Sequence, residues 1–244
     1  MPLSEQTQAE MIQELLKDYG IDCTEEQSLL LAHHLALVIE KNKVLNLTRI
    51  VDVDEALVLH VLDSLLLLAC SGVTMDPFTR FVDMGTGAGF PGIPLGVLTG
   101  AQGVLVDSVG KKVTAVNEFI KELGLKNLVA EHSRVEDLAL RMRGTQDYVV
   151  ARALARTNIL IEYAAPFLKM GGSLLVAKAR PDEDELKEAQ QAAKICGLSL
   201  VSRETFELPH SLGHREILIY KRVGKSTIRL PRKPGTAKRE PLGI

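Results

Sequence analysis

The sequence predicts a doubly wound α/β fold, built on a mostly parallel sheet of seven strands with an antiparallel last strand. From residue 80 onward, short apolar runs alternate with amphipathic stretches, which is typical of strands joined by right-handed helical crossovers. The parallel strands are expected at residues 80–84, 103–107, 127–131, 147–151 and 172–177. The helices between and after them are expected at residues 91–98, 111–123, 134–142, 158–169 and 182–196.

Two further β-rich runs follow at residues 199–208 and 216–221. The link between them, Pro209 to Gly213, is too short for a helical crossover, so the two strands should form an antiparallel hairpin at the sheet edge. This ending is typical of S-adenosylmethionine (AdoMet)-dependent methyltransferases and of few other doubly wound folds.

Composition divides the chain into three parts. Residues 1–75 carry apolar stripes of helical period and should form an N-terminal helical extension, with its third helix near residues 55–70. Residues 76–223 hold the predicted methyltransferase domain. Residues 224–244 are rich in proline, glycine and basic residues, and should form an irregular tail.

The overall composition is that of an ordinary soluble globular protein, with 46% hydrophobic and 25% charged residues. The three cysteines are far apart and lack metal-ligand spacing, so we expect no metal site and free thiols in a reducing cytoplasm. Residues 1–10 are polar and acidic, unlike a signal peptide, and the apolar run at residues 56–70 is too short and too polar to span a bilayer. We therefore expect a cytoplasmic protein without a membrane partner, and a monomer.

Charge is unevenly distributed along the chain, although the net charge is only −2. Residues 1–80 hold five Lys/Arg against thirteen Asp/Glu, whereas residues 221–244 hold eight Lys/Arg and one Glu. A basic tail on an acidic body is common in nucleic-acid-binding proteins, and a merely solvated tail is an equally good interpretation of charge alone. The candidate RNA-binding residues are Lys225, Arg229, Arg232, Lys233, Lys238 and Arg239.

A glycine cluster follows the first strand, in the order Gly85-Thr86-Gly87-Ala88-Gly89-Phe90. The dinucleotide fingerprint requires a third glycine at the position that Phe90 occupies, which disfavours a pyrophosphate ligand. A loop with Gly85, Gly87 and Gly89 after an Asp-bearing strand suits an amino-acid ligand without phosphate. Asp83, near the end of that strand, can receive the ligand's ammonium group; the alternative is a loop cap.

Two later positions suit a nucleoside. Asp107 closes the second strand, where a carboxylate accepts both ribose hydroxyls; the alternative is a cap for the turn that begins at Ser108. Val135 and Glu136 follow the third strand, where an adenine ring needs an apolar wall and an acceptor for its amine. These residues favour AdoMet as the ligand.

The segment after the fourth strand restricts the atom that is methylated. It contains no cysteine nucleophile for a pyrimidine carbon, and no Asn/Asp-Pro-Pro loop for an exocyclic amine; Arg152-Ala153-Leu154 stands there instead. Acceptors that carry a free lone pair remain, such as guanine N7, which needs positioning and no general base. Arg152 is expected to serve the pocket or the target nucleotide. A small-molecule methyltransferase and a non-catalytic nucleotide-binding regulator also fit the glycine loop.

The chain resembles the bacterial 16S rRNA guanine-N7 methyltransferase G family, once called glucose-inhibited division protein B. The resemblance implies AdoMet as methyl donor and N7 of one guanine (guanine 527) in 16S rRNA of the small ribosomal subunit as acceptor. It also implies that Gly85, Phe90, Val135, Glu136 and Arg152 contact AdoMet or border its pocket. The matching segments are Asn46–Thr48, His60–Ser64, Asp83–Pro94, Asp107–Lys112, Ser133–Glu136, Asp147–Ala153 and Pro231–Gly235.

Two groups of histidines keep open interpretations. His60, Asp63 and Ser64 lie on an apolar helix, where they fit either a buried hydrogen-bond network or a role beside the pocket. His33 and His34 are expected at a helix surface and the edge of the core.

Overall fold

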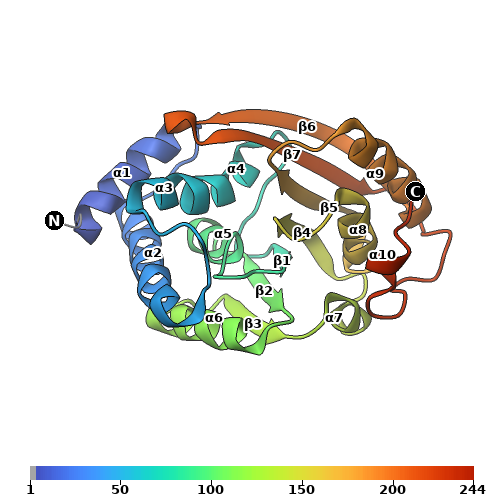
Figure 1. Cartoon of the computed structure of the whole chain (residues 1–244), viewed down its shortest axis with the longest axis horizontal. Coiled ribbons are helices and arrows are strands. Elements are labelled where there is room, and N and C mark those ends of the chain that lie inside the picture. Colours follow the sequence, from blue (N-terminus) through green and yellow to red (C-terminus); the bar gives the residue numbers. More distant parts are fainter. Residues whose placement is uncertain (1–3) are drawn as a thin grey trace.

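A seven-stranded sheet crosses the centre of the computed structural model, which describes residues 4–244 (Figure 1). The first three residues of the acidic N-terminal stretch lie outside the described residues. The strands are β1 (Arg80–Met84), β2 (Gln102–Asp107), β3 (Leu128–His132), β4 (Gln146–Arg152), β5 (Leu168–Lys178), β6 (Leu198–Leu208) and β7 (Gly213–Arg222). Their order in the sheet is β3-β2-β1-β4-β5-β7-β6.

The first five strands are parallel, with β1 between β2 and β4, and β7 is antiparallel to both β5 and β6. This arrangement confirms the predicted doubly wound sheet and the predicted hairpin at its edge. The short 3₁₀ turn η2 (Pro209–Ser211) joins the two hairpin strands.

Helices cover both faces of the sheet, and each face has its own apolar core. One core joins the sheet to α1 (Glu5–Lys17), α2 (Glu25–Leu45), α4 (Asp63–Ala69), α5 (Gly92–Thr99) and α6 (Gly110–Glu122). The other joins it to α7 (Val135–Arg141), α8 (Thr157–Ala164), α9 (Glu183–Cys196) and part of the tail. The N-terminal extension therefore shares its core with the α/β domain.

The third N-terminal helix is continuous but not uniform. It consists of α3 (Val53–Ala56), the π-helical turn η1 (Leu57–Leu62) and α4. Such π turns are rare and often occur at functional sites. His60 lies within this turn and Asp63 directly after it.

One predicted helix was too long. The expectation of a helix over residues 158–169 is wrong at its end, because α8 stops at Ala164 and β5 begins at Leu168. The strand pairs Leu168 with Gln146, and its register then shifts across a bulge to pair Ser173 with Tyr148. An apolar run of this kind fits a buried strand as well as a helix, so its period cannot distinguish the two.

The tail after β7 lies against α7, α8 and α9 and ends at the opposite side of the molecule from α1 (Figure 1). It is mostly irregular, as predicted, but includes the short helix α10 (Thr236–Arg239). Leu230 and Ala237 are buried in the second core. Within residues 4–244, no helix is long and apolar enough to cross a membrane.

Candidate cofactor site

The glycine loop joins β1 to α5 at the carboxyl end of the central strands. Gly85 donates its backbone N–H to the Val106 carbonyl at 2.8 Å, which fixes the loop against β2. Gly85 has φ +74°, and a Cβ there would lie 2.6 Å from Leu154 Cδ1. Only glycine meets both conditions without strain, so the loop passes close to the segment that follows β4.

A cavity of about 310 Å³ opens beside this loop. It lies between the ends of β1 and β2, the start of α7, and the segments that carry Leu154 and Lys238. Its lining comprises Gly85, Gly87, Val106, Asp107, Ser108, Lys112, Ser133, Arg134, Val135, Glu136, Ala153, Leu154, Tyr163, Gly235 and Lys238. The structure thus brings together six predicted site residues: Gly85, Gly87, Asp107, Ser108, Val135 and Glu136.

Asp107 lies at the cavity wall with 8% of its surface exposed. Its Oδ1 accepts a hydrogen bond from the Val109 N–H at 2.8 Å, and its Oδ2 accepts one from the Gly87 N–H at 3.1 Å. The cap that the sequence offered as an alternative is therefore present. A carboxylate has about four acceptor positions, so these two bonds leave capacity for a ligand's hydroxyls.

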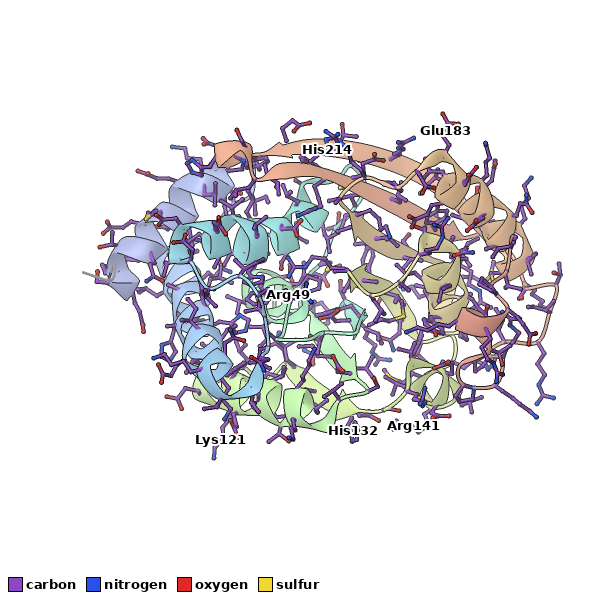
Figure 2. The ribbon with its side chains drawn as sticks, in the orientation of Figure 1. Arg49, Lys121, His132, Arg141, Glu183 and His214 are labelled. Carbon is purple, nitrogen blue, oxygen red and sulfur yellow. The ribbon has the colours of Figure 1, made fainter. Side chains whose placement is uncertain are left out.

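The loop that carries Ser108 is held from the neighbouring strand. His132, at the end of β3, donates from Nε2 to the Ser108 carbonyl at 3.1 Å (Figure 2). The side chain of Glu136, at the start of α7, is buried, and its Oε1 accepts the Gly235 N–H at 2.8 Å. Two segments that are distant in sequence thus hold polar groups of the cavity in place.

Asp83, Gly89 and Phe90 were predicted to bind the cofactor, but they do not line the cavity. Asp83 is fully buried beneath the loop, where its Oδ2 accepts the Gly92 N–H at 3.0 Å. Burial raises the pKa of its carboxyl group to about 6. This is the loop-cap role that the sequence offered as the alternative.

Phe90 packs between two buried histidines of the N-terminal helices. Its ring centroid lies 4.6 Å from that of His34 and 4.7 Å from that of His60, and the His60 ring is stacked nearly parallel to it, with an interplanar angle of 10°. Burial lowers the pKa of His34 to about 3 and that of His60 to about 4, so both rings are neutral. His34, expected at the edge of the core, is fully buried and donates from Nε2 to the Ala88 carbonyl at 3.0 Å.

Arg152 is directed away from the cavity into a buried polar cluster. Its Nη1 donates to the Leu59 carbonyl at 2.7 Å and to Asp63 Oδ2 at 2.9 Å. Arg215, from β7, pairs with the other oxygen of Asp63. The structure thus shows the buried network that the sequence allowed for His60 and Asp63, and it adds Arg215, which sequence reasoning missed. The guanidinium of Arg152 was expected at the pocket. In the structure it forms a buried ion pair with Asp63.

Several cavity residues were not predicted from the sequence. Ala153 and Leu154 directly follow Arg152, so their position after β4 was a usable signal. Tyr163 lies within α8, and Gly235 lies in the tail; neither has a local pattern that indicates a binding site. Lys238, predicted to bind RNA, also borders the cavity.

Arg232, which was predicted to contact RNA, is paired with a carboxylate within the protein. Its guanidinium forms two hydrogen bonds to the buried carboxylate of Glu162, one from Nε at 2.7 Å, and a third to the Glu240 carbonyl at 2.8 Å. These bonds use three of the five N–H donors of the guanidinium. The other five predicted RNA-binding residues are exposed: Lys225, Arg229, Lys233, Lys238 and Arg239.

The cavity has the groups that an adenosine moiety requires. Asp107 offers a carboxylate at the end of β2, Val135 an apolar surface, and Glu136 an acceptor at the start of α7. The positive-φ glycines Gly85 and Gly87 let a ligand approach the backbone closely. Among residues 4–244, no cluster of three His, Cys, Asp or Glu side chains is arranged to hold a metal ion.

Solved structures with a similar fold include methyltransferases. The geranyl diphosphate C-methyltransferase of Streptomyces coelicolor A3(2), solved with S-adenosyl-L-homocysteine, superposes with a TM-score of 0.56 at 14% identity, over 70% of this chain and 80% of that chain. A geranyl diphosphate methyltransferase with sinefungin gives a TM-score of 0.58 at 14% identity, over 70% of this chain and 82% of that chain. The chain thus has the fold of these methyltransferases, with a cavity beside its glycine loop.

The family follows from the sequence relatives. A family model described as rRNA small subunit methyltransferase G matches residues 27–215. The ribosomal RNA small subunit methyltransferase G of Pelotomaculum thermopropionicum is 38% identical over 237 residues, or 96% of this chain and 98% of that protein. The protein of the same name from Desulforamulus reducens is 36% identical over 234 residues, or 95% of this chain and 97% of that protein. The chain belongs to the rRNA small subunit methyltransferase G family, and its methyl donor is AdoMet.

Proposed function

We propose that this protein transfers the methyl group of AdoMet to N7 of one guanine in 16S rRNA, in the small ribosomal subunit. The observation that carries the proposal is the cavity at the glycine loop, formed by Asp107, Val135 and Glu136 in a chain of this family. The RNA acceptor comes from the names of the relatives, and N7 comes from the chemistry of the segment after β4 and the family resemblance.

The proposed reaction makes few chemical demands on the protein. AdoMet supplies a methyl group on a positively charged sulfonium. Guanine N7 carries a free lone pair and no proton, so no general base has to act. Catalysis then depends on holding the two reactants in line and excluding water.

Each predicted site residue has a role in this proposal. Gly85, Gly87 and Gly89 give the loop its backbone conformation, Asp107 accepts the ribose hydroxyls, and Ser108 forms the wall beside it. Val135 covers the adenine ring, and Glu136 accepts from its amine. Asp83 supports the loop from below, through Gly92.

Arg152 and Phe90 act through their neighbours in this proposal. Arg152 is anchored by Asp63, and the two residues after it, Ala153 and Leu154, line the cavity. Phe90, whose ring centroid lies 5.7 Å from the Arg152 guanidinium carbon, supports the same corner. Both are therefore positioning residues for the loop that faces the transferred methyl group.

The tail supplies the phosphate contacts in our proposal, and the acidic N-terminal helices supply none. Lys225 and Arg229 border a surface hollow of about 550 Å³ together with Arg143 and Arg222, and no carboxylate lines it. Exchanging Lys225 and Arg229 for alanine should lower the slope of RNA affinity against salt by about two released ions. Lys121, on α6 at the far side of the molecule from the tail, is the matched control (Figure 2). An unchanged slope in the double variant would contradict the tail's role.

The decisive experiment for the function uses the cell's own ribosomal RNA. The gene is disrupted, 16S rRNA is extracted, and N7-methylguanosine is detected by borohydride–aniline cleavage. Cleavage should disappear, and should return with the wild-type gene but not with an Asp107→Ala copy. An Asp184→Ala copy is the matched control, because Asp184 is an exposed carboxylate on α9. Full cleavage without the gene would refute the assigned acceptor. We further infer that the protein works as a monomer in the cytoplasm, where this RNA is made.

A further inference from the structure

The last part of the chain forms a fixed strap, residues 230–240, across the helices of one sheet face. Arg143 donates to the Leu230 carbonyl at its start, and Arg232 pairs with the buried carboxylate of Glu162 in its middle. Ala237 is 1% exposed in the second core. Undocking of the strap would leave the buried carboxylate of Glu162 without a counter-charge, which is strongly unfavourable, so this pair holds the strap in place.

The strap reaches the cofactor cavity at one point. Gly235 and Lys238 are among the residues that line the cavity, at the end formed by Val135 and Glu136. There the Gly235 N–H donates to Glu136 Oε1 at 2.8 Å. The strap therefore completes the cavity wall and also fixes the carboxylate that faces the cavity.

We propose that this strap is a cofactor-binding element: it forms the adenine-end wall of the pocket and orients Glu136 for the adenine amine. The carboxylate has two oxygens, and the strap uses Oε1, which leaves Oε2 for the ligand. Strap docking and AdoMet binding then stabilise each other, and by linkage each strengthens the other by the same factor. This inference rests on the AdoMet placement proposed above.

A pair of truncations tests the proposal by calorimetric titration with AdoMet. Ending the chain after Lys233 keeps the Arg232–Glu162 pair and removes Gly235 and Lys238. Ending it after Glu240 keeps the whole strap and removes only residues 241–244. The first truncation should weaken AdoMet binding about tenfold, the effect of losing one hydrogen bond to a charged group. The second should change the dissociation constant by less than about twofold. Equal affinities for the two truncations would overturn the proposal.

Hydrogen exchange on the full-length chain provides a test that does not depend on truncated proteins. AdoMet should slow exchange of the backbone amides of residues 235–239, while the amides of α9 serve as a reference on the same face. Unchanged or faster exchange in the strap would overturn the proposal.

The variant Asp107→Ala separates this inference from the placement on which it rests. If Asp107→Ala leaves AdoMet affinity unchanged, the proposed placement of the cofactor is wrong. If Asp107→Ala weakens binding and the truncation after Lys233 does not, the placement holds and the strap inference alone fails.

Discussion

Two polar clusters lie at the carboxyl end of the sheet, and they differ in what holds their carboxylates. In the cofactor cavity, Asp107 and Glu136 accept hydrogen bonds from backbone N–H groups. In the cluster beneath the N-terminal helices, Asp63 lies between the guanidinium groups of Arg152 and Arg215. Main-chain donors fix a carboxylate without adding a counter-charge, whereas two guanidinium groups compensate its negative charge. The partners of an acidic group, more than its place at the strand ends, therefore indicate whether it can bind a substrate.

The largest effect should come from a substitution in the buried cluster of Asp63, Arg152 and Arg215. Asp63→Ala leaves Arg152 and Arg215 buried without their counter-charge, since both side chains are 14% exposed. We expect a loss of about 3–5 kcal/mol in the free energy of unfolding, measured by urea denaturation. Asp184→Ala, at an exposed site, should change it by less than about 0.5 kcal/mol. A loss below about 1 kcal/mol for Asp63→Ala would mean that the cluster is not structural.

The next largest effect should be a loss of stability at acidic pH, because two neutral histidines of the N-terminal helices, His34 and His60, are buried. The folded pKa values of His34 and His60, about 3 and about 4, lie below the ordinary value of 6.5, so the unfolded chain binds protons first as pH falls. Between pH 7 and pH 5 each histidine should therefore cost about 2 kcal/mol of stability. Asp83 opposes this by about 1 kcal/mol, since its raised folded pKa of about 6 favours the folded state as it protonates.

His34→Gln tests this sign directly, because the glutamine amide can still donate to the Ala88 carbonyl. Unfolding free energies of the variant should fall by about 2 kcal/mol less than those of the wild type between pH 7 and pH 5. An identical pH dependence in the two proteins would show that the pKa of His34 does not differ between the folded and unfolded states.

The smallest effect should come from a substitution in the wall of the cofactor cavity. Val135→Ala removes apolar surface from the cavity wall and leaves the main chain of α7 in place. We expect AdoMet binding to weaken about threefold to fivefold, and unfolding free energy to fall by no more than about 1 kcal/mol. For Asp63→Ala we expect the larger effect on stability instead. If Val135→Ala lost stability but kept its affinity for AdoMet, the distinction between the cofactor cavity and the buried cluster would be wrong.

The features that could be predicted from the sequence are those that depend on neighbouring residues. The strands, the glycine loop and the residues that follow β2 and β3 are local patterns, and Gly85, Asp107, Val135 and Glu136 lie at the cavity as expected. Arg152 shows the limit of this reasoning. It was expected directly after the fourth strand and is the last residue of β4, but the direction of its side chain depends on Leu59 and Asp63, which pack there from a different part of the chain.

The tail is a second example in which contacts with distant residues could not be predicted from the sequence. Its composition correctly predicted irregular structure with basic residues. No local pattern indicated that Arg232 would pair with Glu162, seventy positions earlier, or that Gly235 would reach Glu136. The sequence shows how many basic residues the tail has. Which of them remain available to RNA depends on how the tail packs.

The contact between the first helix region and the final hairpin has a consequence for how the chain folds on the ribosome. Tyr19 donates from its hydroxyl to the Glu207 carbonyl, 188 residues later, and its ring lies 6.4 Å from that of Phe206. Helices α1 and α2 pack against each other and against η1, α5 and α6, which are synthesised early, whereas the contact of Tyr19 with β6 can form only after residue 207 has left the exit tunnel. Nascent chains stalled before residue 200 should therefore remain more sensitive to protease around Tyr19 than the finished protein. The last hairpin is therefore the final element of the chain to join the core that contains the N-terminal helices.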